Sequence, residues 1–302
     1  MTNTENSLAA PDPYGGETYD YPDYPDMKAD FTIDQQYDRY TDEDHAVWKD
    51  LLERQLRILP GRACREYMDA FTSMDLAHDR IPRFDEYSEI LTKASGWQIV
   101  AVPGLIPNKE FFEHLAARRF PVTHWIRKRE QLDYIQEPDL FHDFQGHVPL
   151  LMNPVFGDYM AAYGRGGLKA LKNDIPLNFI SRLYWYTVEF GLIKNDDDIR
   201  IYGAGILSSK TESIFCIEND SPNRLGFDLR RIMCTDYRID DFQETYWVID
   251  SFDQLFEETA GQDFLPIYAE IMQNPIHSAW AVNEADTVLH KGTREYALAK
   301  NS

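Results

Sequence analysis

The chain has 302 residues, of which 43% are hydrophobic and 14% aromatic, so it is long and apolar enough to bury a sizeable core. Its formal net charge of −21 argues against nucleic acid or an anionic membrane as a partner, because both would repel such a surface. Three scattered cysteines without a CxxC pair, no recognisable signal peptide and no apolar run of membrane-spanning length predict free thiols in a cytoplasmic protein.

The N-terminal part of the chain changes character near residue 41. Residues 1–40 include PDPYGGETYDYPDYPD (11–26), which offers little apolar surface to bury, so we expect an acidic, flexible tail. A helix is predicted from Thr41, a helix-capping residue type, through 59, because its apolar residues follow the helical period. Two more helices are expected over 80–96, ended by Gly96, and over 108–120, with a short strand and turn over 97–107 between them.

The rest of the chain continues mainly helical. Helices are predicted over 137–146, 153–171 and 176–193, short strands with turns over 198–209 and 235–251, and helix again over 252–272. Without an internal repeat or a dividing linker, residues 41–285 should form one mainly α domain with a small β component. A polar tail is expected over 286–302.

Two histidines mark the first candidate site. His142 and His147 lie in EPDLFHDFQGHVPLL (137–151), a largely apolar stretch, and four residues separate them. Five residues of ideal α-helix advance about 500°, which leaves the two rings about 140° apart. Both imidazoles could face one metal ion only if the helix ended or was distorted between them, and Gly146 and Pro149 are where such an ending would occur.

A third ligand is suggested by Glu189, the single acid in the apolar stretch RLYWYTVEFGLI (182–193). A buried carboxylate without a partner is costly, so it should bind a metal or pair with a base such as Arg182. Two imidazoles and one carboxylate are the ligand set of a non-haem Fe(II) site with open positions, and zinc is the competing interpretation. The H-E-x-x-H helix of zinc peptidases is absent from the sequence.

Three segments together carry a family resemblance. EPDLFHDFQGHVPLL, LYWYTVEFGL and IYGAGILSS (201–209), in this order and spacing, resemble the pterin-dependent aromatic amino acid hydroxylases over about residues 40–260. The resemblance implies a single hydroxylase-like catalytic domain over 41–285. It also implies that His142, His147 and Glu189 hold Fe(II), with a tetrahydropterin (tetrahydrobiopterin or a bacterial analogue) as the second cofactor.

The implied activity is a monooxygenase reaction that converts L-phenylalanine to L-tyrosine with O2. Arg127 then matches the arginine that binds the amino-acid carboxylate, and Ser208 matches a hydroxyl near an iron-bound histidine and the substrate. Trp185 and Phe190 match the walls of the substrate pocket, and Gly205 lies in the turn beside it. Each residue type also has an ordinary structural role, as surface arginine, turn residue or core ring.

The resemblance assigns a second group of residues to the pterin. Asp143 matches an acid near the edge of the pterin ring, Phe111 matches the ring that stacks on it, and Gly104 and Leu105 match the loop whose backbone binds it. Tyr184 matches an aromatic residue beside both the iron and the cofactor. The simpler alternatives are a helix-surface acid, a core ring and a turn.

Substrate choice within the family is a finer question. Trp185 fits the phenylalanine and tyrosine branches, and the apolar Ile239 favours a substrate ring without a hydroxyl. Ile135 stands where animal relatives have a threonine near the amino-acid substrate. Hydroxylation of tyrosine or tryptophan, a zinc hydrolase and a non-enzymatic acidic binding module are the alternatives. Since the regulatory and oligomerisation segments of animal relatives are not found, we expect a monomer that works with a pterin-recycling enzyme.

Overall fold

The N-terminal helices form where the sequence places their end signals. In this computed structural model, which describes residues 21, 23–135, 137–196 and 198–300, helix α1 (Asp42–Ile58) begins after Thr41. The side chains and backbones of Thr41 and Asp44 form a reciprocal capping box. Helix α3 (Phe84–Ser95) ends at Gly96, whose φ of 80° lies in the left-handed region that glycine adopts without steric cost.

The remaining elements alternate helices with short strands. The other helices of seven or more residues are α2 (Arg65–Ser73), α4 (Asn108–Ala116), α5 (Pro154–Lys172), α6 (Asn178–Tyr184), α8 (Glu212–Glu218), α10 (Phe252–Thr259) and α11 (Phe264–Ile271). The shorter ones are η1 (Tyr37–Arg39), η2 (Arg129–Gln131), η3 (His142–His147), η4 (Val148–Met152), η5 (Trp185–Glu189), α7 (Ala204–Leu207), α9 (Leu229–Met233) and α12 (Glu295–Lys300). Of these, η3 and η5 are π-helical turns.

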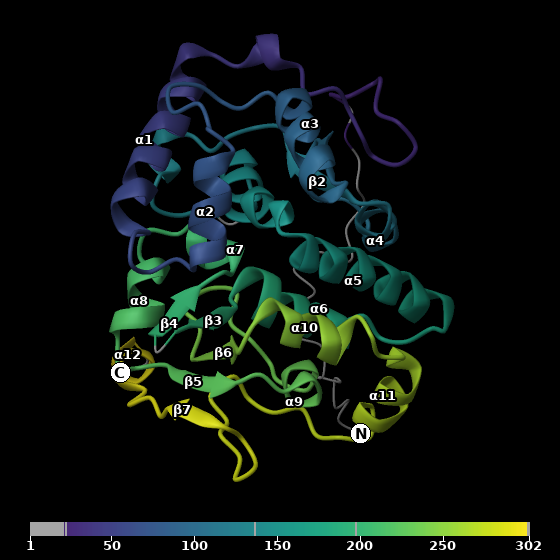
Figure 1. The fold of residues 1–302 in the computed structure, drawn as a ribbon, viewed down its shortest axis with the longest axis vertical. Coiled ribbons are helices and arrows are strands. Elements are labelled where there is room, and N and C mark those ends of the chain that lie inside the picture. Colours follow the sequence, from purple (N-terminus) through teal and green to yellow (C-terminus); the bar gives the residue numbers. More distant parts are fainter. Residues whose placement is uncertain (1–20, 22, 136, 197, 301–302) are drawn as a thin grey trace, which may run out of the picture.

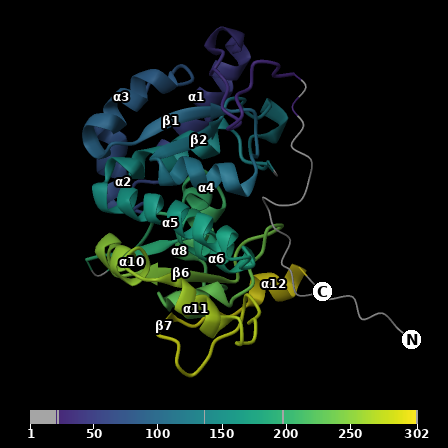
Figure 2. The same ribbon diagram turned by 90° about the vertical axis from the view of Figure 1, so that its right-hand side faces the viewer.

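Two small sheets lie on either side of α5 and α6, as Figures 1 and 2 show. The strands β1 (Gln98–Val102) and β2 (Arg119–Thr123) pair in parallel. The second sheet has the order β4-β3-β6-β5-β7, from the strands β3 (Leu192–Asn195), β4 (Asp198–Ile201), β5 (Asn223–Gly226), β6 (Thr245–Ile249) and β7 (Val288–His290). β6 pairs in parallel with both β3 and β5. The mainly α fold with a small β component is therefore confirmed.

Two predicted helices are too long, and the helix expected over 252–272 is divided into α10 and α11 by the non-helical residues 260–263. Helix α2 and several short elements were not predicted. The helix expected over 108–120 ends at Ala116, because Arg118 takes a φ of 55° and the chain then enters β2. The helix expected over 176–193 gives way to a π-helical turn and then to β3. The strands β2, β3, β5 and β7 depend on pairing partners far away in sequence, which a local apolar pattern does not reveal.

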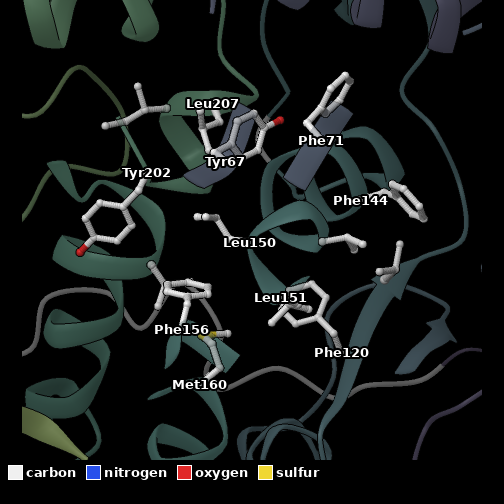
Figure 3. Packing of buried hydrophobic residues seen from close by; sticks show 14 of the residues in the cluster. Tyr67, Phe71, Phe120, Phe144, Leu150, Leu151, Phe156, Met160, Tyr202 and Leu207 are labelled. Atoms are coloured by element: carbon white, nitrogen blue, oxygen red, sulfur yellow. The ribbon is translucent and has the colours of Figure 1, made fainter. Parts of the chain in front are cut away.

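The core is packed around η4, the segment that directly follows the second histidine. In Figure 3, Leu150 and Leu151 lie between Tyr67 and Phe71 on one side and Phe156 on the other. The two leucines are almost fully buried. Because α2 and α5 supply these flanking rings, η4 is held between two rigid helices, and this holds the histidine segment in place.

The segments outside the predicted domain boundaries contact the rest of the chain. Ile33 makes a backbone bridge to Ala101 of β1, and Asp30 forms an ion pair with Arg119 at 2.6 Å. At the other end, β7 joins the larger sheet and α12 follows it. Most of the tyrosine-rich stretch 11–26 lies outside the described residues. The boundaries drawn at 41 and 285 remain predictions.

All three cysteines, Cys64, Cys216 and Cys234, are free thiols and buried. Burial raises the pKa of the Cys64 thiol to about 12. In the part of the chain that the structure describes, no helix has both the length and the apolar character needed to cross a lipid bilayer.

Helices α4 and α5 approach each other closely at Gly164. A Cβ atom built on Gly164 would lie 2.5 Å from the backbone nitrogen of Ala116 and 2.8 Å from the Cβ atom of Leu115. These are backbone or backbone-attached atoms, so the contact could be relieved only by moving a helix. At the nearby Gly166, the nearest atom is the end of the Ile180 side chain at 3.5 Å, an ordinary contact.

We therefore predict that Gly164→Ala lowers the free energy of unfolding by about 1–3 kcal/mol, despite the better helix propensity of alanine. Gly166→Ala is the matched control, and it should be neutral or stabilising by up to about 1 kcal/mol. Urea unfolding of both variants provides the measurement. Equal stability of the two variants would show that the helices can separate freely at this point.

Glu212 in α8 is a buried carboxyl group of the core. Its Oε1 accepts hydrogen bonds from the Tyr246 hydroxyl at 2.7 Å and from the backbone N–H of Gln243 at 3.3 Å. Burial, only partly opposed by these hydrogen bonds, raises the pKa of Glu212 from 4.5 to about 7. The folded chain therefore keeps this proton over a pH range in which the unfolded chain loses it.

This difference in pKa predicts that Glu212 lowers stability as the pH rises from about 4.5 to 7, by on the order of 3 kcal/mol. Glu212→Gln should remove that loss, so the variant gains stability relative to the parent chain over this interval. Urea unfolding at pH 5 and 7.5 measures the gain. Glu257→Gln serves as the control for loss of an exposed glutamate.

Candidate active site

The π-helical turn η3 brings the two histidines together. In a π-helix the backbone of residue i bonds residue i+5, so His142 and His147 lie on the same face, and their Nε2 atoms are 3.3 Å apart. The distortion that the spacing required is thus present, and the 3₁₀ turn containing Pro149 follows directly. A Cβ atom on Gly146 would lie 2.8 Å from the carbonyl oxygen of Ala204, so glycine lets η3 lie against α7.

Glu189 completes a triangle with the two imidazoles. It is the last residue of the π-helical turn η5, with one oxygen 3.2 Å from His147 Nε2 and the other 3.5 Å from His142 Nε2. The alternative partner, Arg182, bonds Asp236 instead at 2.7 Å. The salt bridge considered from the sequence is therefore not formed, and the buried carboxylate points at the histidines.

The spacing of the two Nε2 atoms and the two carboxylate oxygens fits one metal ion. A centre about 2.0–2.2 Å from each atom, the usual distance for imidazole and carboxylate ligands, fits mutual separations of 3.2–3.5 Å. Three protein ligands would leave the remaining positions of the ion open. This set and its openness match non-haem Fe(II) sites.

Ser208 fixes the tautomer of His142. The Ser208 hydroxyl donates its hydrogen to the carbonyl oxygen of Ala204 at 2.8 Å, so it can only accept from His142 Nδ1, which lies 3.0 Å away. The proton of the neutral imidazole is therefore on Nδ1, and the lone pair of Nε2 is directed at the site.

The protonation states suit metal binding. Burial lowers the pKa of His142 to about 4, so its imidazole is neutral near pH 7. Burial alone would raise the pKa of Glu189, but the adjacent imidazoles and a hydrogen bond from the Gly205 N–H outweigh it and leave the pKa lowered. Neutral histidines and an ionised carboxylate are the forms that bind a metal.

A second carboxylate, Asp143, also lies near the histidines. One of its oxygens and one nitrogen of each imidazole lie within 4.8 Å of one another. Asp143 Oδ2, however, accepts the backbone N–H of Thr123 at 2.7 Å, and burial raises the pKa of Asp143 to about 7. A carboxyl group that is partly protonated and already bonded is the poorer ligand, so we assign the metal to Glu189 and leave Asp143 free for another group.

Gly205 packs directly on the ligand turn. A Cβ atom at Gly205 would lie 3.2 Å from Glu189 Oε2 and 3.0 Å from the ring of Phe190. Glycine therefore lets the turn before Ser208 approach both the metal ligand and a predicted pocket wall.

Aromatic rings line one side of the histidines. Tyr184 lies in a stacked orientation with its ring centre 6.4 Å from that of His147, and Phe111 meets Tyr184 edge-on at 5.8 Å. The structure thus links two of the predicted pterin residues to a metal ligand. Phe111 is only partly buried, as a ring must be if a planar cofactor is to stack on it.

The predicted pterin loop is covered by a residue that the sequence did not single out. The hydroxyl of Tyr21 donates to the carbonyl oxygen of Leu105 at 2.5 Å. A Cβ atom on Gly104 would lie 3.2 Å from the same hydroxyl. Tyr21 belongs to the segment predicted as a flexible tail, whose composition gave no sign of this contact.

Arg127 is engaged by a buried partner, Asp139. The Nε and Nη2 atoms of Arg127 donate to the two carboxylate oxygens of Asp139 at 2.8 and 2.7 Å, and neither side chain is more than 6% exposed. Burial alone would raise the pKa of Asp139, but the Arg127 guanidinium holds it lowered. Asp139 also accepts the backbone N–H of His142 at 3.1 Å, so it joins the predicted substrate arginine to a metal ligand. Asp139 was not predicted, because its place in E-P-D (137–139) does not reveal these partners.

The predicted pocket walls, Trp185 and Phe190, pack against each other. Trp185 lies 4.6 Å from Phe190 and 4.4 Å from Tyr237, with interplanar angles of 31° and 17°. The indole N–H of Trp185 donates to Gln243 Oε1 at 3.0 Å. Tyr237 and Gln243 were not predicted, because they come from an irregular segment whose only local signal was its mixed polar and aromatic composition.

Comparison with known proteins identifies the family. A family model described as biopterin-dependent aromatic amino acid hydroxylase matches residues 25–283. The chain belongs to this family. Within it, the phenylalanine-4-hydroxylase of Chromobacterium violaceum is 58% identical over 266 residues, which cover 88% of this chain and 89% of the relative. The phenylalanine-4-hydroxylase of Ralstonia nicotianae is 55% identical over 269 residues, 89% of this chain and 85% of the relative.

Solved structures of this hydroxylase family share the fold. Phenylalanine hydroxylase from C. violaceum with bound iron and phenylalanine has a TM-score of 0.82 and 56% identity, covering 86% of this chain and 94% of that one. The same relative with iron(III) and the oxidised cofactor 7,8-dihydrobiopterin also has a TM-score of 0.82, with 57% identity and coverage of 86% and 93%. The predicted family and its single hydroxylase domain fold are confirmed.

The hydrogen bond from His142 to Ser208 predicts a specific loss of metal affinity. Ser208→Ala removes the acceptor that holds the imidazole in the metal-binding tautomer, so Fe(II) should bind about 10–100-fold more weakly. Anaerobic titration with Fe(II) measures this affinity. The neighbouring Ser209→Ala is the control, because Ser209 Oγ contacts the backbone of Glu212 and not a ligand. Unchanged affinity in Ser208→Ala would contradict the positioning role.

Proposed function

We propose that this hydroxylase converts L-phenylalanine to L-tyrosine, using O2, Fe(II) and a tetrahydropterin. The observation that carries the proposal is the triangle of His142 with the buried His147 and Glu189, in a member of a biopterin-dependent family. The named relatives are phenylalanine-4-hydroxylases, and one of them has been crystallised with iron and phenylalanine.

The three ligands hold the iron and leave part of its surroundings open. When bound, the iron and the pterin together supply the activation of dioxygen. Two imidazole ligands and a single carboxylate place little charge on the site, which favours the reduced ion without closing it. Ser208 keeps the proton of His142 on Nδ1, away from the metal.

Substrate binding is assigned to Arg127 and the Trp185 wall. The bonds of Arg127 to Asp139 use Nε and Nη2, so Nη1 is the guanidinium nitrogen that remains to meet a substrate carboxylate. The packed rings of Trp185 and Phe190 provide an apolar wall for a phenyl ring. Ile239, 44% exposed in the segment that follows Tyr237, adds no polar group to favour a ring hydroxyl. Ile135 offers no hydroxyl to the amino-acid end.

Pterin binding is assigned to the opposite aromatic side. Phe111 would stack on the pterin, Tyr184 lies between Phe111 and His147, and the carboxyl group of Asp143 would meet the polar edge of the ring. The backbone of Gly104 and Leu105 would supply the remaining hydrogen bonds. The dihydrobiopterin complex of the C. violaceum relative supports a pterin of this class.

We also propose a cytoplasmic monomer whose oxidised pterin is recycled by a separate reductase. The buried free thiols support a reducing compartment.

The decisive test of the function is product analysis with matched histidine variants. The Fe(II)-loaded chain should form tyrosine from phenylalanine when tetrahydropterin and O2 are present, and should prefer phenylalanine in competition with tyrosine and tryptophan. His147→Ala should lose iron binding and reduce turnover at least about 1,000-fold, because a ligand is removed. His78→Ala, at an exposed histidine, should leave both unchanged.

Other products would assign the chain differently. Preferential hydroxylation of tryptophan or tyrosine would place it in another branch of the family. Hydrolysis with bound zinc and no pterin-dependent product would overturn the hydroxylase assignment itself.

A further inference from the structure

Gln243 is a buried glutamine whose side chain is fully engaged. It lies just before β6 and is 2% exposed. Its Oε1 accepts from Trp185 Nε1 at 3.0 Å and from the backbone N–H of Arg238 at 3.3 Å. Its Nε2 donates to the carbonyl oxygen of Arg238 at 2.6 Å and to that of Asp241 at 3.5 Å. All four hydrogen-bonding positions of the amide are therefore in use.

The glutamine is itself anchored to the core. Its backbone N–H donates to Glu212 of α8, and the same Glu212 oxygen accepts from Tyr246 of β6. The backbone of Gln243 is thus held by a helix and a strand, and its side-chain amide accepts the hydrogen bond of the Trp185 indole. This anchoring distinguishes Gln243 from a surface glutamine that follows the movements of its neighbours.

The indole has no comparable anchor in its ring contacts. Tyr237 stacks on Trp185 and Phe190 packs against it in a tilted orientation, with ring centres within 4.6 Å, but such ring contacts resist sliding of the indole within its plane only weakly. Tyr237 also belongs to the irregular segment 236–244, in which Ile239 is 44% exposed. The hydrogen bond from Trp185 to Gln243 is the directional contact that fixes where the indole lies within its plane.

The position of the Trp185 indole affects the active site because Trp185 belongs to the turn η5. It is the first residue of η5, and Glu189 is the last. The backbone N–H of Phe190 bonds the Trp185 carbonyl oxygen at 2.8 Å and closes the turn. The proposed wall of the substrate pocket and a ligand of the metal therefore share one rigid turn, so a shift of the indole changes the pocket relative to the reacting centre.

We propose that Gln243 is a positioning residue that fixes the indole of Trp185 as the wall against which the substrate's aromatic ring lies. The inference rests on the proposed function, because it assigns Trp185 to the substrate pocket. It goes beyond that function because the Gln243 amide, which is not part of the pocket wall, determines where the substrate's ring lies. Removing the amide should weaken substrate binding and misplace the ring without changing pterin binding.

The test compares Gln243→Met with the parent chain, both loaded with Fe(II). Methionine keeps the length of the side chain and leaves the indole N–H without an acceptor, so the KM for phenylalanine should rise about tenfold. The KM for tetrahydropterin should stay within about twofold. The fraction of oxidised pterin that yields tyrosine should fall, because a misplaced ring is attacked less often. Gln254→Met is the control for loss of a glutamine outside the pocket, since its side chain bonds Asp250 and Glu258.

Repeating the Gln243→Met substitution in a Trp185→Phe variant distinguishes positioning of Trp185 from a general loss of structure. Trp185→Phe removes the N–H but keeps an aromatic ring, so adding Gln243→Met to it should raise the KM for phenylalanine by less than about twofold. If the effects of the two substitutions multiply instead, Gln243 acts through the segment 238–241 and the inference is wrong. An unchanged KM for phenylalanine in folded Gln243→Met would also overturn it.

Failure of a variant to fold and failure of the parent chain to make tyrosine have separate meanings. If Gln243→Met does not fold, Gln243→Asn, whose amide is one methylene too short to reach the indole, replaces it with the same expectations. A parent chain that makes no tyrosine contradicts the proposed function before any variant is compared. A parent chain that makes tyrosine, with variants that do not differ from it, contradicts only the role of Gln243.

Discussion

The active site depends on two π-helical turns. An ordinary α-helix would direct His142 and His147 about 140° apart, and the extra residue per turn of η3 removes that divergence. The second turn, η5, presents Glu189 to the same point. π-Helical turns are rare because their backbone hydrogen bonds are less favourable, so the surrounding packing has to stabilise them. Here Leu150 and Leu151 follow directly after η3 and are buried between α2 and α5.

Buried polar groups connect the metal ligands to the two binding regions. On one side, Asp139 bonds both the Arg127 guanidinium and the backbone N–H of His142. On the other, Asp143 bonds the end of β2 at Thr123. Both oxygens of Asp139 accept hydrogen bonds, which is the condition under which a buried charge can be tolerated. The proposed substrate arginine and the turn with the proposed metal ligands are therefore held in a fixed relative position.

Local sequence signals predicted the helices well but not the small sheets. The caps at Thr41 and Gly96 depend only on residues within one helical turn, and the structure has both caps. The first two residues of β2 were assigned to the preceding helix and the strand was not predicted, because its pairing with β1 is not visible in its own residues. The metal ligands could be proposed because histidine spacing and a lone buried acid are unusual. Asp139, Tyr237 and Gln243 could not, because each acts through a partner distant in sequence, and their residue types are common.

The burial of all three cysteines has a consequence for the lifetime of the catalyst. An enzyme that activates dioxygen is exposed to the reactive species that escape from its own turnover. Thiols react with such species mainly as exposed thiolates, and burial at Cys64, Cys216 and Cys234 both hides the sulfur and raises the pKa. The fold therefore protects its thiols from oxidation by species formed during turnover. Inactivation during prolonged turnover should begin at residues other than cysteine.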